Sequence, residues 1–217
     1  MKYFFRLVGL LTILGLFQSA AHAAGEAEFW NWFQQNEERL FAGGAGSEET
    51  ITQLGAELRK VNEAVTFEFG PIFKDGKKEF VITADGNKTA FPAVEALYAS
   101  APELPRWIWV KFRPRRAVIS DMGFGDRFVK SGDVNYLMFT DADKVGIMLF
   151  FDEYNADEEI TFGQIGYLML DEALGEYAVE TQVGLIEFQP RTSEFFAQSS
   201  PLKNLPAQFD EYWAGKR

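Results

Sequence analysis

Two tryptophans and several cations alternate along one short segment of the chain. Residues two apart on an extended strand share one face. Those sharing it here are Trp107, Trp109, Lys111 and Arg113, followed by Arg115. Aromatic faces and guanidinium groups together bind carboxylates. The segment is therefore a candidate surface for a small acidic ligand or an acidic stretch of a partner protein.

These cations belong to a basic island within an acidic chain. The island runs from residue 106 to 130 and contains Arg106, Lys111, Arg113, Arg115, Arg116, Arg127 and Lys130. A second interpretation stays open beside ligand binding. The tryptophans would pack in the core under the N-terminal helices, and the cations would neutralise the acidic surface of the chain itself.

Three carboxylates lie around the expected end of a helix at Gly175: Asp171, Glu172 and Glu176. Carboxylates at this end oppose the helix dipole. They mark either an ion pair or a site for acid–base chemistry. In the second case the chain would be a carboxylate-dependent hydrolase or lyase with these three as catalytic residues. Such an enzyme would have a deep cleft and a carboxyl group with a raised pKa.

The N-terminus has the three parts of a secretory signal peptide over residues 1–23. Lys2 and Arg6 precede an apolar run over 7–17, and a small-residue cleavage motif lies at 21–23. The apolar run is too short to cross a bilayer as a helix. We therefore expect a periplasmic or secreted protein that has no membrane span after cleavage.

Cleavage would also limit the available chemistry. It removes His22, the single histidine, and the chain has no cysteine. Histidine bases, cysteine nucleophiles and Cys/His zinc sites are then excluded, and we expect no cofactor and no metal. Lys2 and Arg6 leave as well, so the 21 basic residues fall to 19 against 32 acidic ones, and the formal charge moves from −11 to −13. Such a charge disfavours nucleic-acid binding.

The elements that must position these residues are predicted to form a single α+β domain over 24–217. Two helices come first, over Glu26–Phe41 and from Ser47 onward, separated by a glycine run. Two strand–strand–helix–strand units follow in a mixed or antiparallel sheet. Their strands are expected near 66–69, 79–83 and 106–113 in the first unit, and near 135–140, 145–151 and 182–188 in the second.

The two units share one short sequence echo. Residues 110–114 read VKFRP and residues 186–190 read IEFQP. Together with the repeated order of elements, this match favours an internal duplication as a hypothesis.

Three stretches resemble an uncharacterised family of bacterial proteins. They are ITADGNKTAFPAVEALYASAPELPRW at 82–107, KFRPRR at 111–116 and LDEALGEY at 170–177. The resemblance spans roughly Phe29 to Pro190 and implies a shared fold, but no activity, ligand or site.

These patterns are compatible with three functions. We expect an exported, non-enzymatic binding or protein-interaction domain for an acidic ligand or partner. The first alternative is the carboxylate-dependent envelope enzyme. The second is an inhibitor or immunity-type protein whose acidic surface contacts a basic partner.

Overall fold

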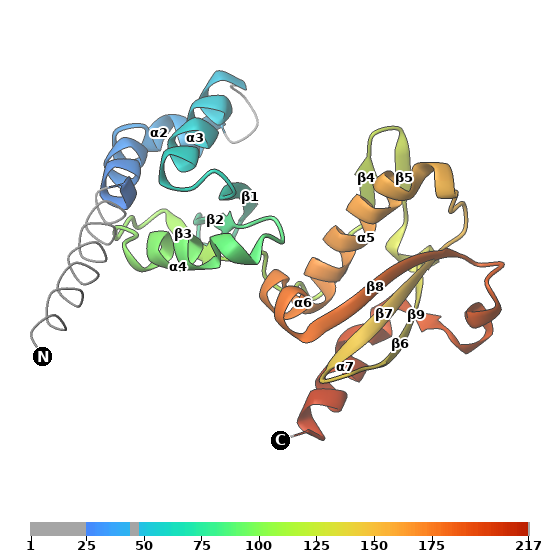
Figure 1. Cartoon of the computed structure of the whole chain (residues 1–217). Coiled ribbons are helices and arrows are strands. Elements are labelled where there is room, and N and C mark those ends of the chain that lie inside the picture. The colour runs from blue at the N-terminus through green and yellow to red at the C-terminus, as the bar shows by residue number, and fades with distance from the viewer. Residues whose placement is uncertain (1–24, 44–47, 217) are drawn as a thin grey trace, which may run out of the picture. The chain divides into compact units, whose positions relative to one another are not determined.

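The computed structural model describes residues 25–43 and 48–216 (Figure 1). The chain divides into two compact units, Met1–Lys111 and Phe112–Arg217, and each is described by itself. The expected signal peptide and Ser47 lie outside the described residues. The assignment of a single domain to 24–217 stays a prediction.

The first unit combines helices with a three-stranded sheet. Its helices are a helix over 25–35, α2 (Glu37–Gly43), α3 (Glu48–Val61), the short η1 (Lys88–Ala90) and α4 (Phe91–Ala99). Its strands are β1 (Thr66–Ile72), β2 (Lys78–Thr83) and β3 (Trp107–Lys111). The central strand, β2, runs antiparallel to β1 and parallel to β3.

One N-terminal helix is interrupted where the sequence predicted continuity. The predicted helix over 26–41 is divided at Asn36, which lies in a turn. The side-chain amide of Asn36 donates to the carbonyl oxygen of Trp32 at 2.8 Å. The backbone N–H of Asn36 donates to the same oxygen at 3.1 Å, and the N–H of Leu40 donates to Asn36, so the interruption is confined to one residue.

The helical pattern of α3 follows directly from its sequence. Glu48 and Glu49 occupy its first turn, Arg59 and Lys60 its last, as the helix dipole favours. Leu54 and Leu58 are fully buried on its inner side.

The second unit contains a four-stranded sheet and a separate small hairpin. Its strands are β4 (Met122–Phe124), β5 (Arg127–Val129), β6 (Asn135–Asp141), β7 (Lys144–Phe151), β8 (Val183–Pro190) and β9 (Ser200–Pro201). Its α-helices are α5 (Glu159–Leu174), α6 (Glu176–Gln182) and α7 (Leu205–Ala214). Short 3-10 helices lie at η2 (Ser131–Asp133), η3 (Ala156–Glu158), η4 (Glu194–Gln198) and η5 (Leu202–Asn204).

The same arrangement of three strands occurs in both units. In the second unit the central strand, β7, runs antiparallel to β6 and parallel to β8. The strand–strand–helix–strand order and the α+β class are therefore confirmed. The first two residues of the sequence echo occupy matching strand positions, because Val110 pairs with Val81 of β2 and Ile186 with Ile147 of β7, but β3 ends at Lys111 whereas β8 continues to Pro190. Common ancestry of the two units stays a hypothesis.

The core of the second unit lies between its sheet and α5. Ile147, Leu149, Ile165 and Met169 are fully buried there. The absence of a side chain at Gly166 lets α5 approach β8 closely, since a Cβ at this position would collide with the ring of Phe188. Over the described residues, no helix is long and apolar enough to span a membrane.

Candidate functional site

Trp107 belongs to the core of the first unit, and the half-buried Trp109 packs against it. Trp107 is 5% exposed, and its ring stacks on Trp109 with centroids 5.7 Å apart. Both rings contact Phe33 of the helix over 25–35 edge-on. The indole N–H of Trp109 donates to the carbonyl oxygen of Pro102 at 2.8 Å. Their shared face is therefore used for packing.

The three cations predicted to extend this strand have carboxylate partners nearby. Nζ of Lys111 lies 3.6 Å from Glu95 of α4, in the first unit. In the second unit, Nη1 of Arg113 lies 3.3 Å from Oδ2 of Asp171, and Nη1 of Arg115 lies 2.9 Å from Oδ2 of Asp210. The five predicted ligand-binding residues are thus divided between the two units, and each of these cations is part of an ion pair.

The rest of the basic island is largely paired too. Arg106 forms an ion pair with Glu38. Arg127 binds Glu153 and Glu158, and its hydrogen bond to Glu158 raises the pKa of Arg127 and lowers the pKa of Glu158. This pattern supports the interpretation in which the island neutralises acidic residues of the same chain.

The three candidate catalytic carboxylates hold the segment 112–120 against α5 and α6. Oε2 of Glu176 accepts a hydrogen bond from the backbone N–H of Arg113 at 2.9 Å. The carboxylate of Glu172 accepts from both the N–H and the hydroxyl of Ser120. Asp171 pairs with the Arg113 guanidinium. These contacts give all three carboxylates a structural task.

Asp171 nevertheless has one property of an acid–base group. Burial raises its pKa to about 7, against the opposing effect of Arg113, and the negative charges of Glu176 and Glu180 raise it further. The raised pKa of Asp171 therefore reflects its burial, with a smaller contribution from two neighbouring carboxylates, and the ion pair with Arg113 only partly offsets them.

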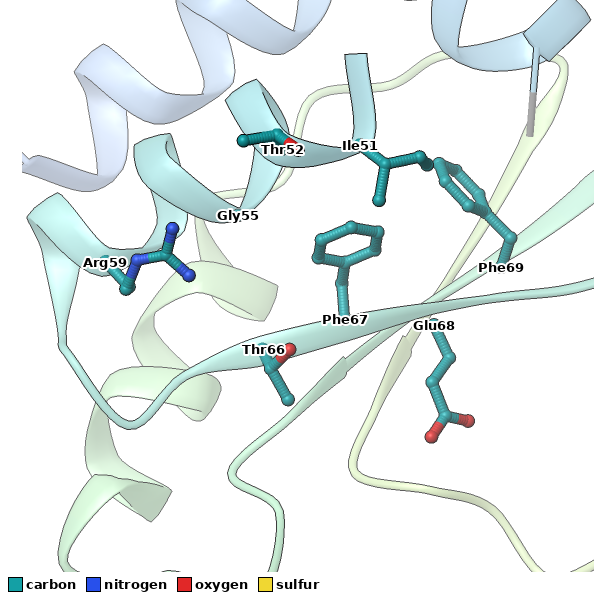
Figure 2. A pocket seen from close by; sticks show the side chains of 8 residues that line it. All are labelled: Ile51, Thr52, Gly55, Arg59, Thr66, Phe67, Glu68 and Phe69. Carbon is teal, nitrogen blue, oxygen red and sulfur yellow. The ribbon is translucent and has the colours of Figure 1, made fainter. Parts of the chain in front are cut away.

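An open groove in the first unit lies between α3 and β1 (Figure 2). Its volume is about 780 Å³, and it is lined by Ile51, Thr52, Gly55, Arg59, Thr66, Phe67, Glu68 and Phe69. Figure 2 shows Phe67 and Phe69 on the side of β1 that faces α3, and Glu68 on the other side. Ile51 and the two rings supply an apolar floor.

This groove follows the backbone edge of β1. Thr66, Phe67, Glu68 and Phe69 are consecutive and their side chains alternate between the two faces of the sheet, yet all four line the same groove. A groove that touches both sets has to pass along the strand edge. It is the outer edge, because the inner one pairs with β2.

The edge is open over a short length only. β1 is the end strand of the β1-β2-β3 sheet, and within the described residues it pairs with β2 alone. Its register shifts between Phe69 and Ile72, and Pro71 has no N–H to donate. Bulges and prolines commonly protect exposed edges. Here they protect the distal end of β1 and leave Thr66–Phe69 accessible.

One cation lies at the end of the groove. Arg59 is exposed in the last turn of α3, and it makes no hydrogen bond or ion pair with any residue in 25–43 or 48–216. Gly55, one helical turn before it, leaves room, since a Cβ there would already lie 3.4 Å from Nη1 of Arg59 and 3.8 Å from the Phe67 ring. The groove therefore combines open backbone groups, an aromatic floor and one available guanidinium.

The second unit shows how the equivalent edge is filled. Its first strand, β6, corresponds to β1 in the repeated arrangement. The outer edge of β6 is paired antiparallel with β9, through Asn135 with Pro201 and Tyr136 with Ser200. In the second unit the chain itself supplies an extended segment at this position.

Sequence reasoning missed this groove because it searched for titratable and aromatic clusters. Two signals were available in the sequence. Gly55 interrupts an otherwise regular helical stripe, which often indicates close packing. Phe67 and Phe69 alternate with polar residues just before Gly70-Pro71, and a proline within a strand is typical of a sheet edge.

Comparison with protein-family models, with curated proteins and with solved structures finds no match for this chain. The resemblance described for 82–107, 111–116 and 170–177 therefore carries no family assignment.

Proposed function

We propose that this chain is a non-enzymatic binding protein whose first unit captures an extended segment of a partner protein along β1. The segment adds to the sheet as an antiparallel strand, and its main-chain groups pair with the outer edge of Thr66–Phe69. The pairing of β9 with β6 is the observation that carries the proposal, because it fills the corresponding edge in the repeated arrangement.

The groove also indicates the side chains that this segment carries. Alternate residues of an added strand face Ile51, Phe67 and Phe69, so they are apolar. A carboxylate on the segment pairs with Arg59, the one cation that lines the groove. A run of acidic residues is disfavoured, because the mature chain would carry a formal charge of −13. The preferred partner is thus largely apolar and has one well-placed acidic residue.

We place this activity outside the cytoplasm, on the basis of the secretory signature over 1–23. Mass spectrometry of the protein purified from its native host tests this placement. A mature N-terminus at Ala24 supports export, and an intact Met1 argues against it.

The binding proposal is tested with selected peptides. A random-peptide library is panned on the immobilised chain 24–217, and enriched peptides are labelled for fluorescence-polarisation titration. We expect alternating apolar residues with one Asp or Glu. In a ¹⁵N-labelled chain, the amide signals of Thr66–Phe69 should shift on binding.

Two variants test the charge of Arg59 and the space beside it. Arg59→Glu should weaken binding about tenfold or more, because it replaces an ion pair with repulsion. Gly55→Leu should weaken it by filling the groove. Lys60→Glu is the matched control, since Lys60 neighbours Arg59 and pairs with Glu57 outside the groove. Equal losses for Arg59→Glu and Lys60→Glu, or amide shifts away from β1, would overturn the proposal.

A further inference from the structure

A cavity in the second unit lies beside α6 and α7 and shares no residue with the β1 groove. Its volume is about 370 Å³, near the lower end of the range of small-molecule sites. Ala178 and Gln182 line it from α6, and Phe209, Asp210 and Trp213 line it from α7. Residues four apart on a helix share one face, so each of the two helices presents one face to the cavity.

One part of the cavity wall is apolar and belongs to a packed core. Leu174, at the end of α5, is 6% exposed, and Phe209 is 4% exposed. The ring of Trp213 packs beside them, with its centroid 6.2 Å from that of Phe209 and 5.4 Å from that of Tyr212. This wall is preformed, which reduces the ordering cost of binding.

The other part of the wall offers hydrogen-bond donors and acceptors together. Within the described chain Arg115 forms hydrogen bonds through Nη1 alone, which reaches both carboxylate oxygens of Asp210 at 2.9 Å. Nε and Nη2 of Arg115 can therefore still donate, and each oxygen of Asp210 can accept again. Gln182 is half-buried, and its side-chain amide makes no hydrogen bond with any residue in 25–43 or 48–216.

The cavity wall has no net charge. Among the described residues that line it, Arg115 and Asp210 are the charged ones, and they neutralise each other. An ionic ligand would find no unpaired counter-charge there. Mixed donors and acceptors beside an aromatic ring suit a neutral molecule that has several hydroxyls and an apolar C–H face. A sugar ring has this combination.

We infer that this cavity binds a neutral sugar residue, whose C–H face lies against Trp213 and whose hydroxyls bond to the polar part of the wall. A hydroxyl both donates and accepts. Neighbouring hydroxyls can therefore accept from Arg115 and donate to Asp210 without breaking the ion pair, and a further one bonds to the amide of Gln182. The inference is independent of the proposed peptide groove, because the two sites lie in different units.

The test uses ¹⁵N-labelled chain 24–217 titrated with the methyl glycosides of glucose, galactose, mannose and N-acetylglucosamine. We expect saturable shifts of the Trp213 indole signal and of the Gln182 side-chain amide signals with at least one of them. The best glycoside is then compared with a disaccharide that carries the same residue at its non-reducing end. Tighter binding of the disaccharide identifies the ligand as the end of a glycan, and equal binding identifies it as a free sugar.

Two further ligands test the hydrogen bonds and the neutrality of the cavity. Cyclohexanol, a six-membered ring with a single hydroxyl, should bind about tenfold more weakly than the best glycoside, or worse. Glucuronate should bind no more tightly than methyl glucoside, because its carboxylate meets no unpaired cation in the wall.

A matched pair of variants completes the test. Gln182→Leu keeps a side chain of similar size without its polar groups, and should weaken binding of the best glycoside about fivefold or more. Gln189→Leu makes the same change at a half-buried position of β8 outside the cavity, and should leave the affinity within about twofold. No saturable shift of either signal with any of the four glycosides, tighter binding of cyclohexanol or glucuronate, or equal effects of the two variants would each overturn the inference.

Discussion

The buried Asp171–Arg113 pair should make the stability of the second unit depend on pH in an unusual direction. Asp171 is 6% exposed, and burial raises its pKa from 3.8 to about 7. The groups that face it are Arg113, Glu176 and Glu180. The folded state therefore holds the Asp171 proton more tightly than the unfolded state does.

The sign and size of the effect follow from this difference. An acid with a raised folded-state pKa contributes most stability below its unfolded pKa and loses that contribution as pH rises through the folded one. The difference between 3.8 and about 7 corresponds to about 4 kcal/mol in the free energy of unfolding. The loss should fall between about pH 4 and about pH 7.

The substitution Asp171→Asn removes the titration and keeps an oxygen that can accept from Arg113. Urea unfolding of both proteins, followed by far-UV circular dichroism from pH 4 to 8, gives their stabilities over this window. The Asp171→Asn variant is expected to gain on the wild type by about 4 kcal/mol from the acid to the neutral end. Asp210→Asn, which removes the exposed partner of Arg115, controls for loss of one negative charge from the same unit.

A direct titration checks the same reasoning. The side-chain carboxyl ¹³C signal of Asp171 should have its midpoint near pH 7. A midpoint near 4, or a stability difference between Asp171→Asn and wild type that is constant with pH, would refute the link between burial and this pKa.

Two further outcomes follow from the packing of the second unit. Gly166→Ala should destabilise the fold by about 1–3 kcal/mol, because its Cβ would collide with the Phe188 ring. A Cβ at Gly163 on the same helix would lie 3.6 Å from the Phe188 ring, so Gly163→Ala should stabilise the fold by up to about 1 kcal/mol. Thermal unfolding compares the two variants. Similar melting temperatures would contradict the contact between Gly166 and Phe188. Glu172→Ala should speed hydrogen exchange at the Ser120 amide, which donates to Glu172, while the Leu149 amide in β7 serves as the reference. An unchanged Ser120 rate would show that Glu172 does not hold the segment.

Local sequence patterns predicted the regular elements well. A helix was expected from Ser47 onward, where α3 lies, and Gly175, with a φ of 87°, ends α5 as expected. Several short elements escaped prediction, among them the β4–β5 hairpin and α6. The β4–β5 hairpin has strands of only three residues, and α6 begins immediately after Gly175, where a helix end hides a new start.

The candidate sites were harder to predict because they depend on distant contacts. Arg113 meets Asp171 across 58 positions, and Arg115 meets Asp210 across 95. No spacing rule reveals such partners, so cations that looked available are paired in the fold. The β1 groove was missed for a related reason. Which strand lies at the edge of a sheet is known only once the strand order is known.

The short length of the accessible edge on β1 also bears on how the protein behaves at high concentration. Fibril-forming segments generally need about six or seven residues that stack without interruption. The bulge before Ile72 and the ring of Pro71 leave four residues from Thr66 to Phe69. One short strand can pair there, but a stack of copies would lack continuous hydrogen bonding. The protein can therefore keep an unpaired strand edge and still resist polymerisation.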